Sequence, residues 1–147
     1  MPNTEPDIPV TSSVHVAVGV VVNRDREVLV ARRHYNQHQG GLWEFPGGKV
    51  MPGEEVREAL ARELAEEVNI EVRESSPFLK IHHDYGDKKV LLDVWYVSMF
   101  AGQATGCEGQ PVKWITVDEF DHHDFPEANL EIISQVRILL GSQSQNH

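Results

Sequence analysis

The chain has 147 residues, 24% of them charged and 40% hydrophobic, which suits one domain with a single core. It carries 13 Lys and Arg against 23 Asp and Glu, a formal net charge of −10. This acidity argues against binding along a nucleic-acid backbone and against anchoring on an anionic membrane, because both need a basic surface. The single cysteine, Cys107, excludes an internal disulfide and a cysteine-rich zinc site.

The N-terminal residues, 1–13, are acidic and proline-containing, without the basic start and apolar stretch of a secretory signal. The longest apolar run, residues 16–22, is too short to cross a bilayer. We therefore expect a cytoplasmic protein, and we also expect a monomer. A single domain is expected over residues 14–140, between a flexible leader (1–13) and a flexible polar tail (141–147).

The first third of the chain predicts strands. Residues 14–23 are rich in valine and predict a buried strand, and residues 28–32 predict a second strand that pairs with the first as a hairpin. A polar, glycine-containing loop follows over residues 34–42. Residues 43–45 are short and extended, and we expect Pro-Gly-Gly at 46–48 to end them with an unusual backbone.

The remainder predicts two helices and three strands. Residues 54–68 have an apolar side chain at every fourth position, which is typical of an amphipathic helix. Alternation predicts strands over 78–85 and 89–100, with a turn between them, and a short strand over 112–116. A second helix over 130–140 should end at the following glycine. Long strands with only two helices predict an α/β (α+β) fold with a mixed sheet packed between helices.

The first predicted helix concentrates carboxylates. Glu63, Glu66 and Glu67 fall within an arc of about 100°, at the edge of the apolar stripe. Glutamates so close together repel one another, but they could supply oxygen ligands to Mg²⁺ or Mn²⁺. Arg62 could hold a carboxylate through a bidentate pair. The alternative is an acidic helix face that is simply solvated.

Residues 48–70 resemble the signature of the Nudix hydrolases. That signature is Gly, five residues, Glu, seven residues, then Arg-Glu-apolar-any-Glu-Glu-any-Gly-apolar, and every position matches except the last Gly, which is Asn69. Because Asn also tolerates a left-handed backbone after a helix, we expect the loop to keep its geometry. Further segments across residues 14–140 resemble the members that hydrolyse oxidised guanine nucleotides.

The resemblance implies an α-β-α sandwich and a Mg²⁺-dependent hydrolase, with Mn²⁺ as a possible substitute. It implies hydrolysis of 8-oxo-dGTP to 8-oxo-dGMP and pyrophosphate, which keeps the damaged nucleotide out of DNA. The general base is left open between Glu63 and Glu108. The implied metal ligands are Gly47, Glu63, Glu66, Glu67 and Glu108, and the implied supporting residues are Glu54 and Arg62.

Asn129 is the residue on which we base the choice of substrate. Its amide offers one donor and one acceptor side, which suits the protonated N7 and the O6 of 8-oxoguanine; the alternative is a helix N-cap. Phe45 could lie against the base or simply pack in the core. Arg33, with the weaker candidates His38 and Lys49, could meet a phosphate or be an ordinary surface residue.

Two other functions remain open at this point. Residues 41–45 also resemble relatives acting on CTP or 5-methyl-dCTP, so a pyrimidine triphosphate pyrophosphohydrolase is one rival. A nucleotide-binding module without turnover is another, although the intact glutamates argue against it. In each case the expected partner is a small-molecule nucleoside triphosphate.

Overall fold

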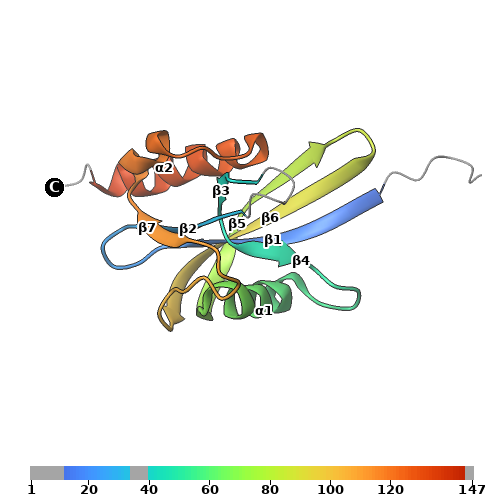
Figure 1. Cartoon of the computed structure of the whole chain (residues 1–147), viewed down its shortest axis with the longest axis horizontal. Helices are drawn as coiled ribbons and strands as arrows, with labels where there is room; N and C mark the ends of the chain where they lie inside the picture. The colour runs from blue at the N-terminus through green and yellow to red at the C-terminus, as the bar shows by residue number, and fades with distance from the viewer. Residues whose placement is uncertain (1–11, 34–39, 145–147) are drawn as a thin grey trace, which may run out of the picture.

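The computed structural model describes residues 12–33 and 40–144. Two helices, α1 (Val56–Val68) and α2 (Leu130–Ser144), lie on opposite sides of the strands (Figure 1). Two short 3₁₀ helices, η1 (Val117–His122) and η2 (Glu127–Asn129), precede α2. This arrangement confirms the predicted α+β fold with strands between helices.

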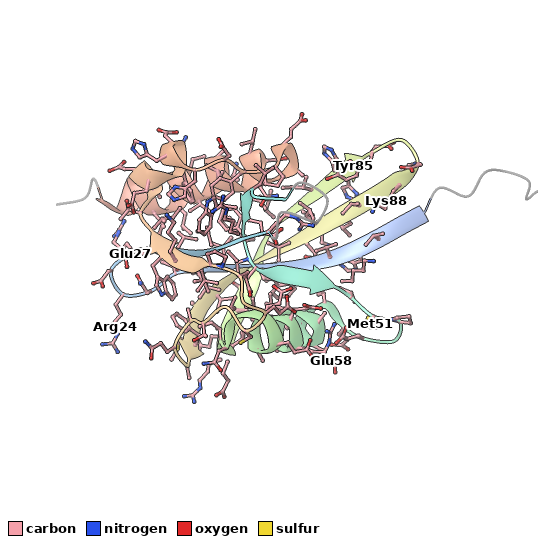
Figure 2. All side chains as sticks on the ribbon, viewed as in Figure 1. Arg24, Glu27, Met51, Glu58, Tyr85 and Lys88 are labelled. Carbon is pink, nitrogen blue, oxygen red and sulfur yellow. The ribbon has the colours of Figure 1, made fainter. Side chains whose placement is uncertain are left out.

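The larger sheet has four strands and is mixed, as predicted. Its strand β1 (Ser12–Val21) is parallel to β6 (Lys88–Ala101), with Val16 opposite Leu92, whereas the other neighbours are antiparallel. The hairpin of β5 (Glu71–Asp84) and β6 closes where the Tyr85 amide donates to the Lys88 carbonyl (2.8 Å), and both residues are labelled in Figure 2. In order across the sheet, the strands are β4 (Gly47–Lys49), β1 (Ser12–Val21), β6 (Lys88–Ala101) and β5 (Glu71–Asp84).

A second, antiparallel sheet corrects the predicted hairpin of residues 14–32. It contains β3 (Trp43–Glu44), β2 (Val28–Arg32) and β7 (Val112–Ile115), in that order. Strand β1 pairs with β4 over residues 16–18 on one edge and with β6 along its whole length on the other, whereas β2 pairs with β3 and β7. Only an isolated bridge, between Val22 and Val28, joins the two regions.

The Pro-Gly-Gly segment does not have the unusual backbone predicted for it, because Gly47 and Gly48 form the extended strand β4. A Cβ atom on Gly47 would lie 2.0 Å from the Ala17 carbonyl oxygen. A Cβ atom on Gly48 would lie 2.2 Å from the Glu63 carboxyl carbon. The glycines are therefore needed for close approach to β1 and to α1, and not for a left-handed backbone.

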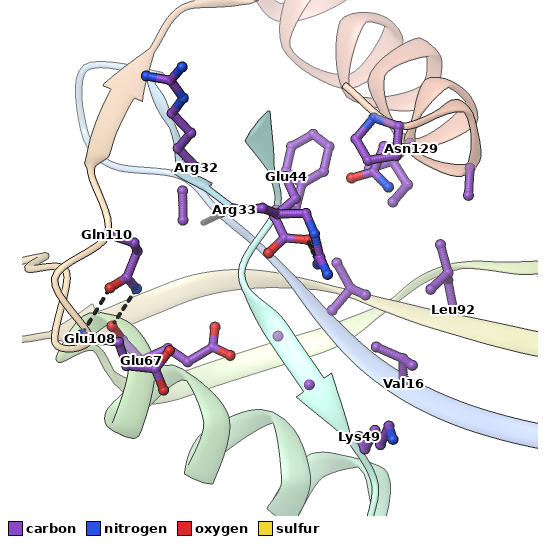
Figure 3. A pocket seen from close by; sticks show the side chains of 18 of the residues that line it. Val16, Arg32, Arg33, Glu44, Lys49, Glu67, Leu92, Glu108, Gln110 and Asn129 are labelled. Carbon is purple, nitrogen blue, oxygen red and sulfur yellow. Dashed lines mark hydrogen bonds and ion pairs between the residues drawn. The ribbon is translucent and has the colours of Figure 1, made fainter. Parts of the chain in front are cut away.

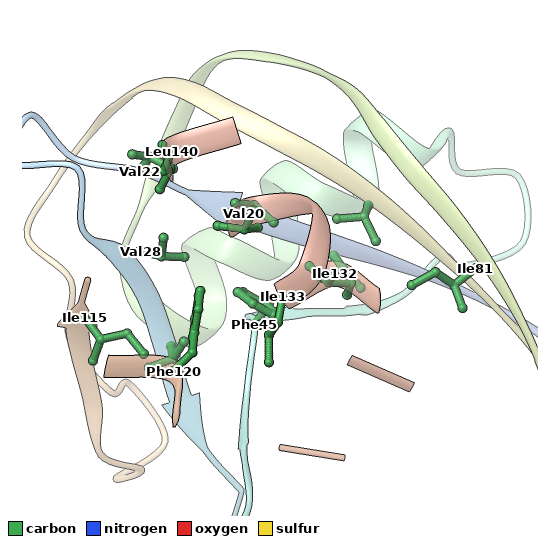
Figure 4. Packing of buried hydrophobic residues seen from close by; sticks show 14 residues of the cluster. Val20, Val22, Val28, Phe45, Ile81, Ile115, Phe120, Ile132, Ile133 and Leu140 are labelled. Carbon is green, nitrogen blue, oxygen red and sulfur yellow. The ribbon is translucent and has the colours of Figure 1, made fainter. Parts of the chain in front are cut away.

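The core has two parts because side chains of β1 alternate between the two faces of the sheet. Val18 and Val20 face α2, in the cluster shown in Figure 4. Ala17 and Val21 face α1, where the fully buried Leu64 packs with them. The α1 stripe predicted from the sequence is thus the face that anchors this helix to the sheet.

Among the described residues, no helix is both long and apolar enough to span a membrane.

Several helix and strand ends differ from prediction, most of them by one or two residues. α1 begins at Val56, after a cap in which the Glu55 amide donates to the Glu58 carboxylate (2.9 Å). It ends at Val68 and is followed by the capping residue Asn69, which has the expected left-handed backbone (φ 62°). α2 continues to Ser144, past the glycine predicted to end it. β5 begins at Glu71 and includes Pro77, which is tolerated because β5 is an edge strand.

Candidate active site

A pocket of about 280 Å³ opens between the two sheets, α1 and η2 (Figure 3). One end carries the carboxylates of Glu67 and Glu108. The other end carries apolar side chains and the amide of Asn129. Arg33 and Glu44 lie between these ends. The pocket therefore joins an acidic region to a region suited to a flat, partly apolar group.

Arg62 braces the acidic side of α1. Its Nε and Nη2 donate to the two carboxylate oxygens of Glu54 (2.8 and 3.0 Å), a bidentate pair. Its Nη1 donates to Glu63 (2.9 Å), and Nη2 also donates to the Lys49 carbonyl (3.0 Å). The Arg62 hydrogen bonds, with one from the Met51 amide, lower the pKa of Glu54 to about 2. Arg62 thus fixes the start of the helix and the Glu63 carboxylate in one network.

Glu67 is the most perturbed acid of the site. Burial, followed by the neighbouring carboxylates of Glu63, Glu44 and Glu108, raises the pKa of Glu67 to about 8. A hydrogen bond from the Gly47 backbone opposes this shift in part. An ionised Glu67 in such surroundings would be stabilised by a cation.

Glu44 is a site residue that the sequence analysis missed. Its carboxylate accepts a hydrogen bond from Arg33 Nη1 at 2.8 Å, and both side chains line the pocket. Burial raises the pKa of Glu44, while Arg33 acts against the rise. The sequence contains a signal for this role, because Glu44 lies between two aromatic residues in an extended segment. Neighbouring side chains of a strand point to opposite faces, so the Glu44 carboxylate points away from both aromatic rings.

The carboxylates predicted as metal ligands are not all gathered at one point. Glu66 is 61% exposed, contacts Arg62 at 3.4 Å, and is not among the pocket residues. In the described ranges, no group of three His, Cys, Asp or Glu side chains is arranged to hold one ion. The donor chemistry nevertheless fits a hard divalent cation, because the carboxylates of Glu63, Glu44 and Glu108 lie near the half-buried Glu67. A ligand set of three would form only when side chains reorient.

The candidate substrate residues occupy different places. Asn129 ends η2 immediately before α2 and lines the pocket, so it stands both at a helix start and at the site. Phe45 also lines the pocket and is buried, stacked on Phe125 at 5.7 Å between ring centres. Lys49 is exposed at the pocket edge. His38 lies outside the described residues.

The fold and the braced acidic helix define the class of this protein. A model of the NUDIX domain matches residues 17–135, and the chain belongs to the Nudix family of hydrolases. These hydrolases generally need a divalent metal ion.

Within the family, the chain is 36% identical to the 8-oxo-dGTP diphosphatase of Escherichia coli K12, over 86% of this chain and 98% of that protein. It is 33% identical to the CTP pyrophosphohydrolase of the same organism, over 79% of this chain and 86% of that one. A solved structure of MutT, from work on the Aliivibrio salmonicida and Vibrio cholerae proteins, superposes with a TM-score of 0.75. It is 37% identical and covers 85% of this chain and 97% of its own.

Proposed function

We propose that this chain is a Mg²⁺-dependent pyrophosphohydrolase that converts 8-oxo-dGTP to 8-oxo-dGMP and pyrophosphate. The observation that carries the proposal is one pocket with Asn129 at one end and the Glu67 and Glu108 carboxylates at the other. This separation suits a nucleotide whose base and triphosphate need different surroundings. The similarity to an 8-oxo-dGTP diphosphatase supports the same substrate. Acting in the cytoplasm, the enzyme would keep the oxidised nucleotide from DNA synthesis.

The proposed metal is Mg²⁺, with Mn²⁺ as a substitute. Its ligands would come from Glu63, Glu66, Glu67, Glu108 and the Gly47 carbonyl. When bound, the metal would neutralise the triphosphate charge and lower the pKa of a water molecule. The net charge of −10 makes such a cation necessary for binding an anionic substrate.

The proposed reaction needs one water molecule and a base. The oxygen of the water molecule attacks the β-phosphorus and forms a new P–O bond. The bond between the β-phosphorus and the oxygen that joins the α- and β-phosphates breaks, and this bridging oxygen leaves with the monophosphate. Glu63 and Glu108 are the candidates for the base. Glu63 is held by Arg62, whereas Glu108 is on an exposed loop, so comparing kcat and its pH profile for E63Q and E108Q separates them.

Asn129 provides the test of substrate choice. The wild-type protein should hydrolyse 8-oxo-dGTP with a kcat/KM at least about tenfold above that for dGTP, since N7 is a donor only in the oxidised base. Asn129→Ala should bring the two values together, because the amide that reads N7 and O6 is removed. Steady-state pyrophosphate release measures both. A wild-type enzyme that does not prefer 8-oxo-dGTP contradicts the proposal.

The same assays address the second candidate function, pyrimidine triphosphate hydrolysis, which the similarity to a CTP pyrophosphohydrolase favours. On that function CTP or 5-methyl-dCTP is the better substrate, and Asn129→Ala leaves its turnover intact. Release of pyrophosphate from none of these nucleotides would indicate a binding module without turnover.

A further inference from the structure

Gln110 is one of two buried polar side chains in the described part of the chain, with 9% of its surface exposed. Its amide group makes two hydrogen bonds to residues of the site, both drawn in Figure 3. Nε2 donates to the main-chain carbonyl of Glu67 (3.0 Å), and Oε1 accepts from the main-chain amide of Glu108 (2.9 Å). A single side chain thus connects the last turn of α1 to the loop that carries Glu108.

The loop around Gln110 is compact. The Cys107 amide also donates to the Glu67 carbonyl (2.9 Å), so this carbonyl accepts two hydrogen bonds from the loop. A Cβ atom on Gly106 would lie 1.8 Å from the Gln110 carbonyl oxygen, which shows how closely the chain folds back. Carbonyls in the last turn of a helix lack partners within the helix, and here the loop supplies them.

We propose that Gln110 is a positioning residue that fixes the main chain of Glu108 against α1, so that the Glu108 and Glu67 carboxylates face the same pocket. The catalytic part of this proposal rests on the proposed function. The hydrogen-bonding part does not, because it concerns only how the loop is held. Glu108 itself is exposed, so the buried amide of Gln110 gives its backbone a fixed point that its own side chain does not provide.

Two variants test how the loop is held. Gln110→Ala removes both hydrogen bonds, and Gln110→Glu keeps the shape but cannot donate to the Glu67 carbonyl while its carboxylate is ionised. Hydrogen exchange of the Glu108 amide should be at least about tenfold faster in Gln110→Ala, which loses its acceptor, than in the wild type or in Gln110→Glu, which keeps an acceptor oxygen. Gln103→Ala, an exposed glutamine earlier in the same segment, is the matched control and should leave this exchange unchanged. Wild-type exchange of the Glu108 amide in Gln110→Ala would overturn the proposal.

Kinetics then test whether the effect passes through Glu108. Gln110→Ala should lower kcat for 8-oxo-dGTP about tenfold with KM within about twofold. In an E108Q background the same substitution should cause no further loss of kcat, because the carboxylate being positioned is already gone. A full additional loss, or a change in KM alone, would overturn the proposal by showing that Gln110 acts elsewhere. If the wild type does not hydrolyse 8-oxo-dGTP, the proposed function fails, while the exchange result still decides whether Gln110 holds the loop.

Discussion

Glu54 and Glu67 lie near opposite ends of the signature segment, yet their carboxyl pKa values move in opposite directions. Arg62 lowers the pKa of Glu54 to about 2, and burial among carboxylates raises that of Glu67 to about 8. The chemistry of each glutamate is thus set by its neighbours and not by its residue type. The signature predicts which glutamates are present, but only the fold determines which one lies among other carboxylates.

The shift at Glu67 has a consequence for stability. A carboxyl group with a raised pKa in the folded state favours folding when protonated. The Glu67 contribution is therefore fully present below its ordinary pKa of 4.5 and is lost as the pH rises through about 8. In metal-free protein, we expect the free energy of unfolding to fall across this range, by about 2 kcal/mol because the site keeps some contact with solvent. Urea unfolding in the presence of a chelator measures it.

Glu67→Gln is the control for this dependence, because the amide stays neutral at every pH. The variant should be more stable than the wild type at about pH 8 and similar to it at about pH 4. Added Mg²⁺ should reverse the difference by stabilising the ionised wild-type carboxylate. Equal pH dependence in the two proteins would show that Glu67 is not the group responsible.

At the scale of the elements, α1 was largely predictable and the strand pairing was not. The apolar stripe and the left-handed Asn69 follow from local pattern and local backbone preference, and the structure has both. Which strand pairs with β1 depends on contacts far apart in sequence, such as the parallel pairing with β6. The apolar run of β1 is compatible with a hairpin strand and with a central strand. The prediction therefore paired β1 with the next strand along the chain, β2.

The contact of β4 with α1 gives a prediction at this scale. Gly48→Ala would place a Cβ 2.2 Å from the Glu63 carboxyl carbon, so either the strand or the carboxylate must move. We expect a loss of about 1–3 kcal/mol in the free energy of unfolding, and at least a tenfold lower kcat, about 1.4 kcal/mol in the activation barrier.

Gly141→Ala is the matched control for Gly48→Ala. Its new methyl group would meet nothing within 4 Å, in the helix α2. It should leave kcat unchanged and stabilise the protein by up to about 1 kcal/mol, because Ala is the better helix former. If Gly48→Ala behaves like this control, the close approach of β4 to Glu63 does not matter for the site.

At the scale of the whole molecule, an acidic chain forms a pocket for an anionic substrate. The composition alone predicted an enzyme or binding domain that avoids nucleic acid and membranes, but not the pocket. The residues the sequence analysis missed, Glu44 and Gln110, lie outside the signature and act through contacts that span 11 and 43 positions. Such partners cannot be read from spacing along the chain, whereas the clustered glutamates of one helix can.

The most direct test of the proposed function is pyrophosphate release from 8-oxo-dGTP by the wild type and by Glu67→Gln, each with Mg²⁺ and with a chelator. We predict rapid release only for the wild type with Mg²⁺, and a kcat about a thousandfold lower for the variant, near 4 kcal/mol in the barrier. A wild-type rate that survives the chelator, or a Glu67→Gln rate equal to that of the wild type, would contradict the account.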